Sequence, residues 1–473
     1  MKSLKRVLAL SMAGCMAVGV LAGCNNNSGG SSGGADDEDK PSAVGEESVD
    51  TSSVKQIYFL NFKPEISDKY DAIAAEYEKQ TGVKVKVQTA ASGEYEKMLT
   101  SEMGKSEPPT IFQINGPVGY QNWKDYCADL KATELYNQLN DKSLAVTNGD
   151  GVYGVPYAVE GYGIIYNNAI MDKYIATSDA KIKSVDEINS FAKLKEVVED
   201  MTAKKADLGI EGVFGSTSLK QGDDWRWQTH LMNVPLYYEF KGEGSPITNC
   251  LNSETLEFKY ADNYKNIFDL YTDNSCTDKK LLGSKTVDES MAEFATGKCA
   301  MIQNGNWAWG QVSGVEGNTV KEDDIKFLPI YTGVDGEEKQ SLCIGTENYF
   351  AINSQVDAAT QQASVEFLNW LFTSDYGKKA VVNDLGFIAP FNSFKDDEKP
   401  SDPLAKEVLK YMGDSDKETV IWTFAGIPSE NWKQGFGASL LEYVQGNKDW
   451  TKVVDEAKSS WTTERQAAAE AAE

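Results

Sequence analysis

Hydrophobic residues after position 53 recur with two alternating periods, which predicts a succession of strands and helices. The run 54–60, VKQIYFL, is typical of a buried strand. Apolar residues then recur every three or four positions, as on one face of a helix, until Gly82. Residues 83–88 and 110–114 are predicted strands, with a second helix opening at Ser92 between them. This strand–helix–strand–helix–strand order predicts a parallel sheet with right-handed crossovers, and hence an α/β fold.

Polar residues stand at the carboxyl ends of two of these strands. Asn61 follows the first strand, while Gln113 and Asn115 close the third. In open parallel sheets, ligands bind outside the carboxyl ends of the strands. We therefore expect Asn61, Gln113 and Asn115 to line a binding site.

The same alternation continues through the remainder of the chain. Further strands are predicted at 150–168, 325–330 and 349–353, and further helices at 185–205, 253–271, 356–372 and from 449 to the end. Thr286 and Glu289 have the spacing of a capping box, in which each side chain pairs with a free amide at the start of a helix.

The stretch 297–312, GKCAMIQNGNWAWGQV, passes from an apolar strand through Asn304-Gly305-Asn306 into two tryptophans. Tryptophan after a strand is most often part of the core. Neighbouring side chains in extended structure point in opposite directions, however, so one of Trp307 and Trp309 can pack inward while the other faces a ligand.

The first 23 residues have the pattern of an export signal. Basic residues precede an apolar stretch at 7–20, which is shorter than the roughly 20 residues that span a membrane. The sequence LAGC at 21–24 resembles a bacterial lipobox, which implies a lipid on Cys24. Residues 24–53, rich in Gly, Ser, Asn and acidic residues, are predicted to be a disordered tether. We expect the protein outside the cytoplasm, anchored through Cys24 to the outer face of the cytoplasmic membrane.

Composition excludes several other functions. The formal net charge of −26 opposes binding to nucleic acid or to anionic lipid. The single histidine, His230, makes a histidine-based metal site or a Ser-His-Asp triad hard to build. No nucleotide-binding or hydrolase motif occurs, and we expect no cofactor and no enzymatic activity. A Cys250–Cys276 disulfide is left open by the sequence.

Three stretches, 151–168, 294–312 and 346–381, resemble the extracellular solute-binding proteins of carbohydrate ABC importers, the family of maltose-binding protein. The closest matches are PYAVEGYGIIYNN and GKCAMIQNGNWAW. The resemblance implies two α/β lobes joined by a hinge, with the ligand in the cleft between the lobes. It also implies transmembrane permease subunits as partners.

The resemblance places the first lobe at 54–159 plus 330–374 and the second at 160–329 plus 375–473. It gives Trp307 the position of an aromatic platform for a sugar ring, leaving Trp309 for packing. It gives Glu160 the position of a carboxylate that accepts from sugar hydroxyls. Gly116 departs from the family pattern, because maltose-binding protein has an aspartate there, so maltose itself is not the expected ligand.

Further candidates are aromatic or polar residues that could line the cleft. They are Tyr157, Asp224, Trp225, Arg226, Trp227, Glu347, Trp422 and Trp432. The cluster 223–227 is equally compatible with the edge of a core in which arginine stacks on tryptophan.

The sequence thus predicts a lipid-anchored receptor that captures a sugar or oligosaccharide for an ABC importer. Two alternatives stay open. Tryptophans beside carboxylates also form cages for polyamines or quaternary ammonium compounds. A secreted glycoside hydrolase would use two of the 72 acidic residues.

Overall fold

The computed structural model describes residues 43–216, 218–395 and 397–472. Cys24, the export signal and most of the predicted tether lie outside the described residues. Within the described residues, no helix is long and apolar enough to cross a membrane. The last part of the predicted tether is ordered, contrary to expectation. Val44 is buried against the first core, and its amide donates to the Asp129 carbonyl at 2.9 Å.

The first sheet has the strand order β2-β1-β3-β11-β5-β4. Its strands are β1 Gln56–Asn61, β2 Lys84–Thr89, β3 Ile111–Asn115, β4 Val146–Asn148, β5 Gly151–Pro156 and β11 Asn348–Ile352. Strand β1 pairs in parallel with β2 and β3, as the sequence predicts, but β11 runs antiparallel to both β3 and β5. The sheet is therefore mixed.

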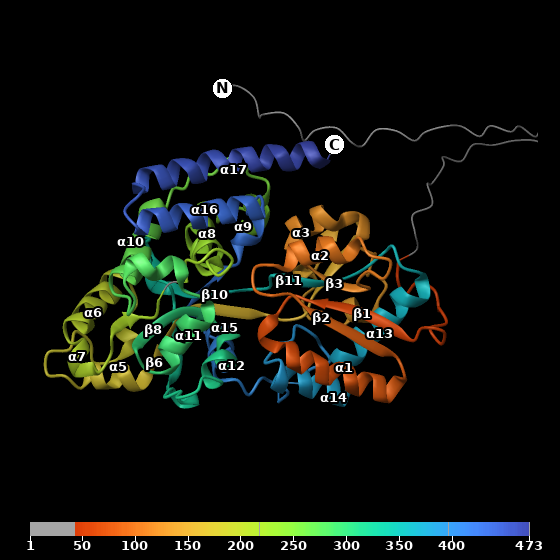
Figure 1. Cartoon of the computed structure of the whole chain (residues 1–473), viewed down its shortest axis with the longest axis horizontal. Coiled ribbons are helices and arrows are strands. Elements are labelled where there is room, and N and C mark those ends of the chain that lie inside the picture. The colour runs from red at the N-terminus through yellow and green to blue at the C-terminus, as the bar shows by residue number, and fades with distance from the viewer. Residues whose placement is uncertain (1–42, 217, 396, 473) are drawn as a thin grey trace, which may run out of the picture. The chain divides into compact units, whose positions relative to one another are not determined.

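Helices cover both faces of this sheet, which explains why β1 is apolar throughout. Ile57 and Phe59 pack on the side of α1 (Ser67–Thr81) and α13 (Ala358–Thr373). Tyr58 and Leu60 pack on the side of α2 (Tyr95–Met103) and α3 (Gly116–Trp123). Figure 1 shows α2 and α3 on the opposite side of β1 and β3 from α1.

The second sheet has the order β12-β10-β6-β8-β7, and β9 also pairs with β6. Its strands are β6 Glu160–Asn167, β7 Gly212–Phe214, β8 Cys299–Gly305, β9 Ile325–Leu328, β10 Gln340–Gly345 and β12 Glu418–Ile421. Strand β6 is its centre, antiparallel to β8, β9 and β10. We call each sheet with the helices packed on it a lobe.

The remaining α-helices precede, connect or follow the strands of the two sheets along the chain. They are α4 Glu134–Asn137, α5 Asn168–Ile175, α6 Phe191–Ala203, α7 Lys205–Leu208, α8 Asn233–Phe240, α9 Pro246–Leu251, α10 Ala261–Asp273, α11 Val287–Ala295, α12 Ala308–Ser313, α14 Asp375–Lys379, α15 Pro403–Met412, α16 Glu430–Val444 and α17 Trp450–Ala472. The π-helical turns 226–231 and 380–384 are not predicted by any periodicity in the sequence.

Two short segments carry the chain from one sheet to the other. Residues 157–159 lie between β5 and β6, and residues 346–347 lie between β10 and β11. Strand β10 belongs to the second sheet although it falls within 330–374, and Val381 lies in the first core although it falls within 375–473. The exact lobe boundaries stay a prediction.

The turn after β8 differs from the sequence expectation. Trp307 has helical backbone angles and caps α12, and Trp309 lies inside that helix, so neither is in extended structure. Alternation along a strand therefore does not separate the two side chains. Trp307 packs against the large core of the second lobe, whereas Trp309 packs against a smaller core on the other face of β8.

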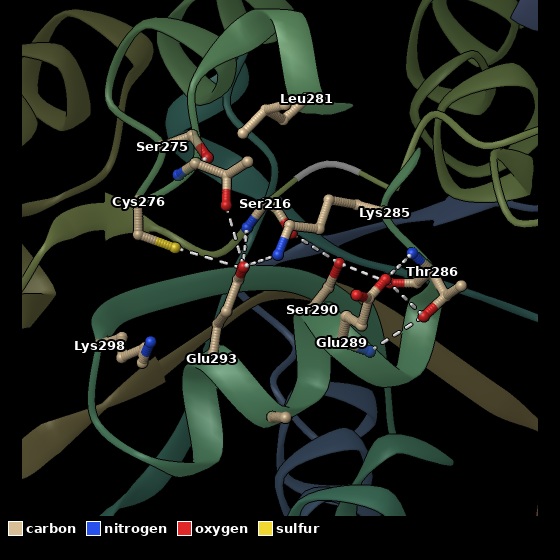
Figure 2. Close-up of polar contacts among 12 residues, drawn as sticks. Ser216, Ser275, Cys276, Leu281, Lys285, Thr286, Glu289, Ser290, Glu293 and Lys298 are labelled. Carbon is tan, nitrogen blue, oxygen red and sulfur yellow. Dashed lines mark hydrogen bonds and ion pairs between the residues drawn. The ribbon is translucent and has the colours of Figure 1, made fainter. Parts of the chain in front are cut away.

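Glu293 on α11 joins three segments of the second lobe (Figure 2). Its carboxylate accepts from the Ser216 amide at 2.8 Å, the Cys276 thiol at 3.2 Å and the Thr277 hydroxyl at 3.0 Å. Lys285 pairs with the same carboxylate at 3.1 Å. These contacts outweigh the effect of burial and hold the pKa of Glu293 below its usual value.

The capping box of α11 forms as predicted, with Glu289 donating its amide to Thr286 and accepting the Thr286 amide. The five cysteines in the described part of the chain are all free thiols, so Cys250 and Cys276 are not bridged.

Candidate functional site

Aromatic rings gather where the second sheet faces the first lobe. We call Tyr162, Trp225, His230, Trp307, Trp422 and Phe424 the aromatic cluster. The imidazole of His230 stacks on Tyr162 with 4.4 Å between ring centroids. The ring of Trp225 packs edge-on against the same imidazole, with 5.0 Å between centroids. Trp307 lies 6.2 Å from Trp225 and 5.5 Å from His230, and both tryptophans are only half-buried.

The position of Trp307 is fixed by the turn that precedes it. The Asn306 amide donates to the Gly161 carbonyl at 3.0 Å, and the Gly161 amide donates to the Asn306 side chain at 2.9 Å. Gly305 allows the ring to fold back, because a Cβ there would lie 2.2 Å from the ring of Trp307. The strand, turn and ring thus form one rigid unit on β6.

A buried ion pair lies beside this ring. The Nζ of Lys63 is 2.8 Å from Glu160 and 3.4 Å from Glu65, and it lies 5.6 Å from the centroid of Trp307. Burial alone would lower the pKa of Lys63, but the charges of Glu160 and Glu65 raise it above its ordinary value. Lys63 therefore stays charged.

Asn61 and Gln113 hold the turn that presents Lys63. Asn61 donates to the Lys63 carbonyl at 2.8 Å and accepts from its amide at 3.1 Å. Gln113 accepts from the Phe62 amide at 2.6 Å. Both residues lie near the carboxyl ends of their strands, as the sequence predicts. Their side chains form hydrogen bonds with the backbone of Phe62 and Lys63.

The ion pair and Trp307 open onto a cavity of about 330 Å³ between segments of both lobes. Its wall includes Trp309, Phe387 and Asn306. The charged residues of its wall are Lys63, Glu65, Glu160, Glu322, Asp384, Asp402 and Lys406. Acidic residues outnumber basic ones in this wall.

Glu347 lies in the second crossing segment, close enough to Lys433 and Lys63 for their charges to act on it. Burial raises its pKa to about 7; Lys433 and Lys63 lower it, and Glu160 and Glu430 raise it further. Lys433 extends from α16 and is itself buried. Glu160 thus follows the first short crossing segment, and Glu347 lies in the second.

His230 is a neutral member of the site. Burial, followed by the positive charges of Arg226 and Lys63, lowers its pKa well below the ordinary value. Its Nδ1 and the Nε1 of Trp422 are buried and have no hydrogen-bond partner within the described part of the chain. Buried polar atoms in this condition cost about 1–3 kcal/mol each.

The cluster 223–227 divides between cleft and core. The guanidinium of Arg226 lies 4.8 Å from the Trp225 ring centroid and donates to Ser218 at 3.1 Å. Burial lowers the pKa of Arg226 to about 10. The guanidinium lies over Trp225 from inside the lobe. Trp227 packs against Phe268 and Tyr271 and is part of the core.

Asp224 anchors a loop. It accepts from the Gly222 amide at 3.2 Å and from Gln228 at 2.9 Å. Burial raises its pKa to about 6.

The remaining residues that the sequence suggests for the site differ in how deeply they are buried. Trp432 is in the core, with its Nε1 donating to the Ala457 carbonyl at 2.8 Å on α17. Tyr157 is buried against Phe350 and Phe387 in the first crossing segment. Asn115 is half-buried at the end of β3.

Sequence reasoning did not choose Lys63, Lys433 or Asn306 as site residues, and it considered His230 only as an argument against a metal site or a catalytic triad. The partners of Lys63 and Asn306 are 97 and 145 residues away along the chain. Among the described residues, no group of three His, Cys, Asp or Glu side chains is placed to hold a metal.

The fold is that of two-lobed binding proteins. A chitin oligosaccharide binding protein is 18% identical, with a TM-score of 0.67 over 88% of this chain and 100% of that chain. RafE in complex with raffinose is 15% identical, with a TM-score of 0.64 over 87% and 99%. A sugar transporter from Bacillus licheniformis in complex with stachyose is 16% identical, with a TM-score of 0.64 over 86% and 100%.

The family model for bacterial extracellular solute-binding proteins matches residues 72–408. The chain therefore belongs to this family of binding proteins, which act outside the cytoplasm. Comparison with curated protein sequences finds no match.

Proposed function

We propose that the protein is a non-catalytic receptor that captures a sugar or oligosaccharide and delivers it to the permease of an ABC importer. The observation that carries the proposal is the half-buried face of Trp307, fixed beside the Lys63–Glu160 pair at a cavity between the lobes. A sugar ring presents C–H groups to an aromatic face and hydroxyls to polar groups at its edge.

Each part of the site has a role in this proposal. Trp307 and Trp225 supply the aromatic platform, and Arg226 holds Trp225 from behind. Glu160 accepts from sugar hydroxyls, and Lys63 and the neutral His230 donate to sugar oxygens. The two structures with raffinose and stachyose support a neutral oligosaccharide as the ligand, because they share this fold.

The lipid anchor and the closure of the lobes belong to the same proposal. We infer that Cys24 carries the lipid and that the chain is held on the outer face of the cytoplasmic membrane. The two lobes, each a sheet with the helices packed on it, close on the ligand by bending at 157–159 and 346–347. The permease subunits then recognise the closed form.

A cationic ligand is the second candidate. It is favoured by the wall of the cavity, where five carboxylates face two lysines. A polyamine or quaternary ammonium compound would be held by the same carboxylates and rings.

Titration calorimetry of the wild-type protein distinguishes the two. The panel is raffinose, stachyose, chitotriose, maltotriose, xylotriose, cellotriose and spermidine. Saturable binding of a neutral saccharide without breakdown of that saccharide supports the proposal. Binding of spermidine alone would replace the saccharide by a cation, and cleavage of the saccharide would make the protein an enzyme.

A further inference from the structure

Two glycines from different lobes touch through their backbones. Gly93 lies between β2 and α2 of the first lobe, and Gly222 lies between β7 and the π-helical turn of the second. A Cβ on Gly93 would lie 2.7 Å from the carbonyl oxygen of Gly222 and 2.9 Å from its Cα. Side chains do not approach a backbone this closely, so only glycine at 93 allows the contact.

Each of the two loops is held within its own lobe. The Gly222 amide donates to Asp224, whose other carboxylate oxygen lies against Gly437 of α16. On the facing side, the Glu94 amide donates to the Ala91 carbonyl at 3.1 Å and closes the turn around Gly93. The loops therefore meet as fixed surfaces whose separation follows that of the lobes.

The contact differs from other approaches between the lobes. A Cβ on Gly116 would lie 3.6 Å from the Cβ of Ala425, an ordinary van der Waals distance at which the neighbour does not have to move. At Gly93 the neighbour is backbone, which cannot rotate away. A side chain at position 93 must push one lobe away from the other.

We propose that the Gly93–Gly222 contact sets how far the two lobes close over the ligand. The inference rests on the proposed function, since the ligand is what closure encloses. A side chain at 93 reduces the population of the closed form, and the apparent affinity falls by the same factor.

Gly82 provides a matched control. Its φ is +79°, close to the +73° of Gly93, but a Cβ there has nothing within 4 Å. Gly93→Ala and Gly82→Ala therefore both place alanine at a similar positive φ, and only the first places a methyl group against the other lobe. Calorimetry with the saccharide that binds the wild type should give a Kd at least about tenfold weaker for Gly93→Ala and unchanged for Gly82→Ala. Equal affinities of the two variants would overturn the proposal.

Small-angle X-ray scattering tests the contact without any saccharide. A methyl group at position 93 should hold the lobes further apart, so Gly93→Ala should have a larger radius of gyration than the wild type, whereas Gly82→Ala should not. Equal radii of gyration of the two variants would contradict the contact.

The outcomes separate the two proposals. A radius of gyration of Gly93→Ala equal to that of Gly82→Ala, in the presence and absence of every saccharide in the panel, would overturn the contact. A larger radius of gyration for Gly93→Ala, together with no binding of any saccharide to the wild type, would leave the contact in place and overturn the proposed function.

Discussion

The Nζ of Lys63 lies 2.8 Å from Oε1 of Glu160, and this pair joins the end of β1 in the first sheet to the first residue of β6 in the second. Both residues are almost fully buried. Ion pairs in this setting are costly to break, because the remaining charge stays buried without a partner. The pair therefore couples the stability of the chain to the junction between its lobes.

Lys63→Met should lower the free energy of unfolding by about 3–5 kcal/mol at pH 7, because it leaves the Glu160 carboxylate unpaired. Urea unfolding followed by tryptophan fluorescence measures the loss. Lys69→Met is the control, since Lys69 pairs with Asp68 on the surface at 2.9 Å and such pairs contribute little. Equal losses in the two variants would contradict a special role for Lys63.

Glu347→Gln should change the dependence of stability on pH. Burial raises the pKa of Glu347 to about 7, so the folded state binds a proton that the unfolded state releases near pH 4.5. Wild-type stability then falls as the pH rises from about 4.5 to 7 and is constant above that. The variant, which lacks this titration, should gain about 1–3 kcal/mol relative to the wild type between pH 5 and pH 8.

Urea unfolding of both proteins at pH 5, 6, 7 and 8 tests this prediction. Asp224 and Asp402, whose pKa values burial raises to about 6, are present in both proteins and cancel in the difference. A difference between wild type and variant that does not change with pH would show that Glu347 is ionised in the folded state at pH 5.

Glu293→Gln should destabilise the second lobe by about 2 kcal/mol, because the uncharged amide loses the ion pair to Lys285 and a charged acceptor for the Ser216 amide. Thermal unfolding measures the change. Glu289→Gln on the same helix is the control, since glutamine also serves in a capping box. The account is wrong if Glu293→Gln unfolds at the same temperature as Glu289→Gln and the wild type.

Cys24→Ala should release the protein into the medium when it is expressed in a bacterium that attaches lipid at a lipobox, because the lipid attaches to the Cys24 thiol. Membrane and medium fractions are compared by immunoblot. Cys15→Ala, within the apolar part of the signal, is the matched control and should stay with the membrane. Retention of the Cys24→Ala protein would remove the anchor from the proposal.

The parts of the fold that could be predicted are those with a strong local signal. Strand β1 is a buried apolar run, α1 has a regular apolar face that ends at Gly82 with φ +79°, and the capping box specifies the start of α11. The order of the first three strands follows from their alternation with helices. The run around Cys343 is strand-like, but β10 was not placed in the predicted order of elements because its apolar part, 342–344, is only three residues long.

The site was only partly predictable, for a physical reason. Trp307 and Glu160 stand in motifs that resemble a known family, and Asn61 and Gln113 follow from the topology of a parallel sheet. Lys63, by contrast, matters through a partner 97 residues away, and no local pattern records that distance. Trp227 and Trp432 look like cleft residues in the sequence, yet tertiary packing places both in the core.

The most direct test of the central claim is calorimetric titration of the saccharide that binds the wild type into Trp307→Ala and Trp309→Ala. Both tryptophans are half-buried at the wall of the same cavity, so the substitutions remove similar surface. Loss of at least about 1.4 kcal/mol of binding free energy in Trp307→Ala, with Trp309→Ala close to wild type, is the predicted result. Wild-type affinity in Trp307→Ala would contradict the account and place the aromatic platform elsewhere in the aromatic cluster.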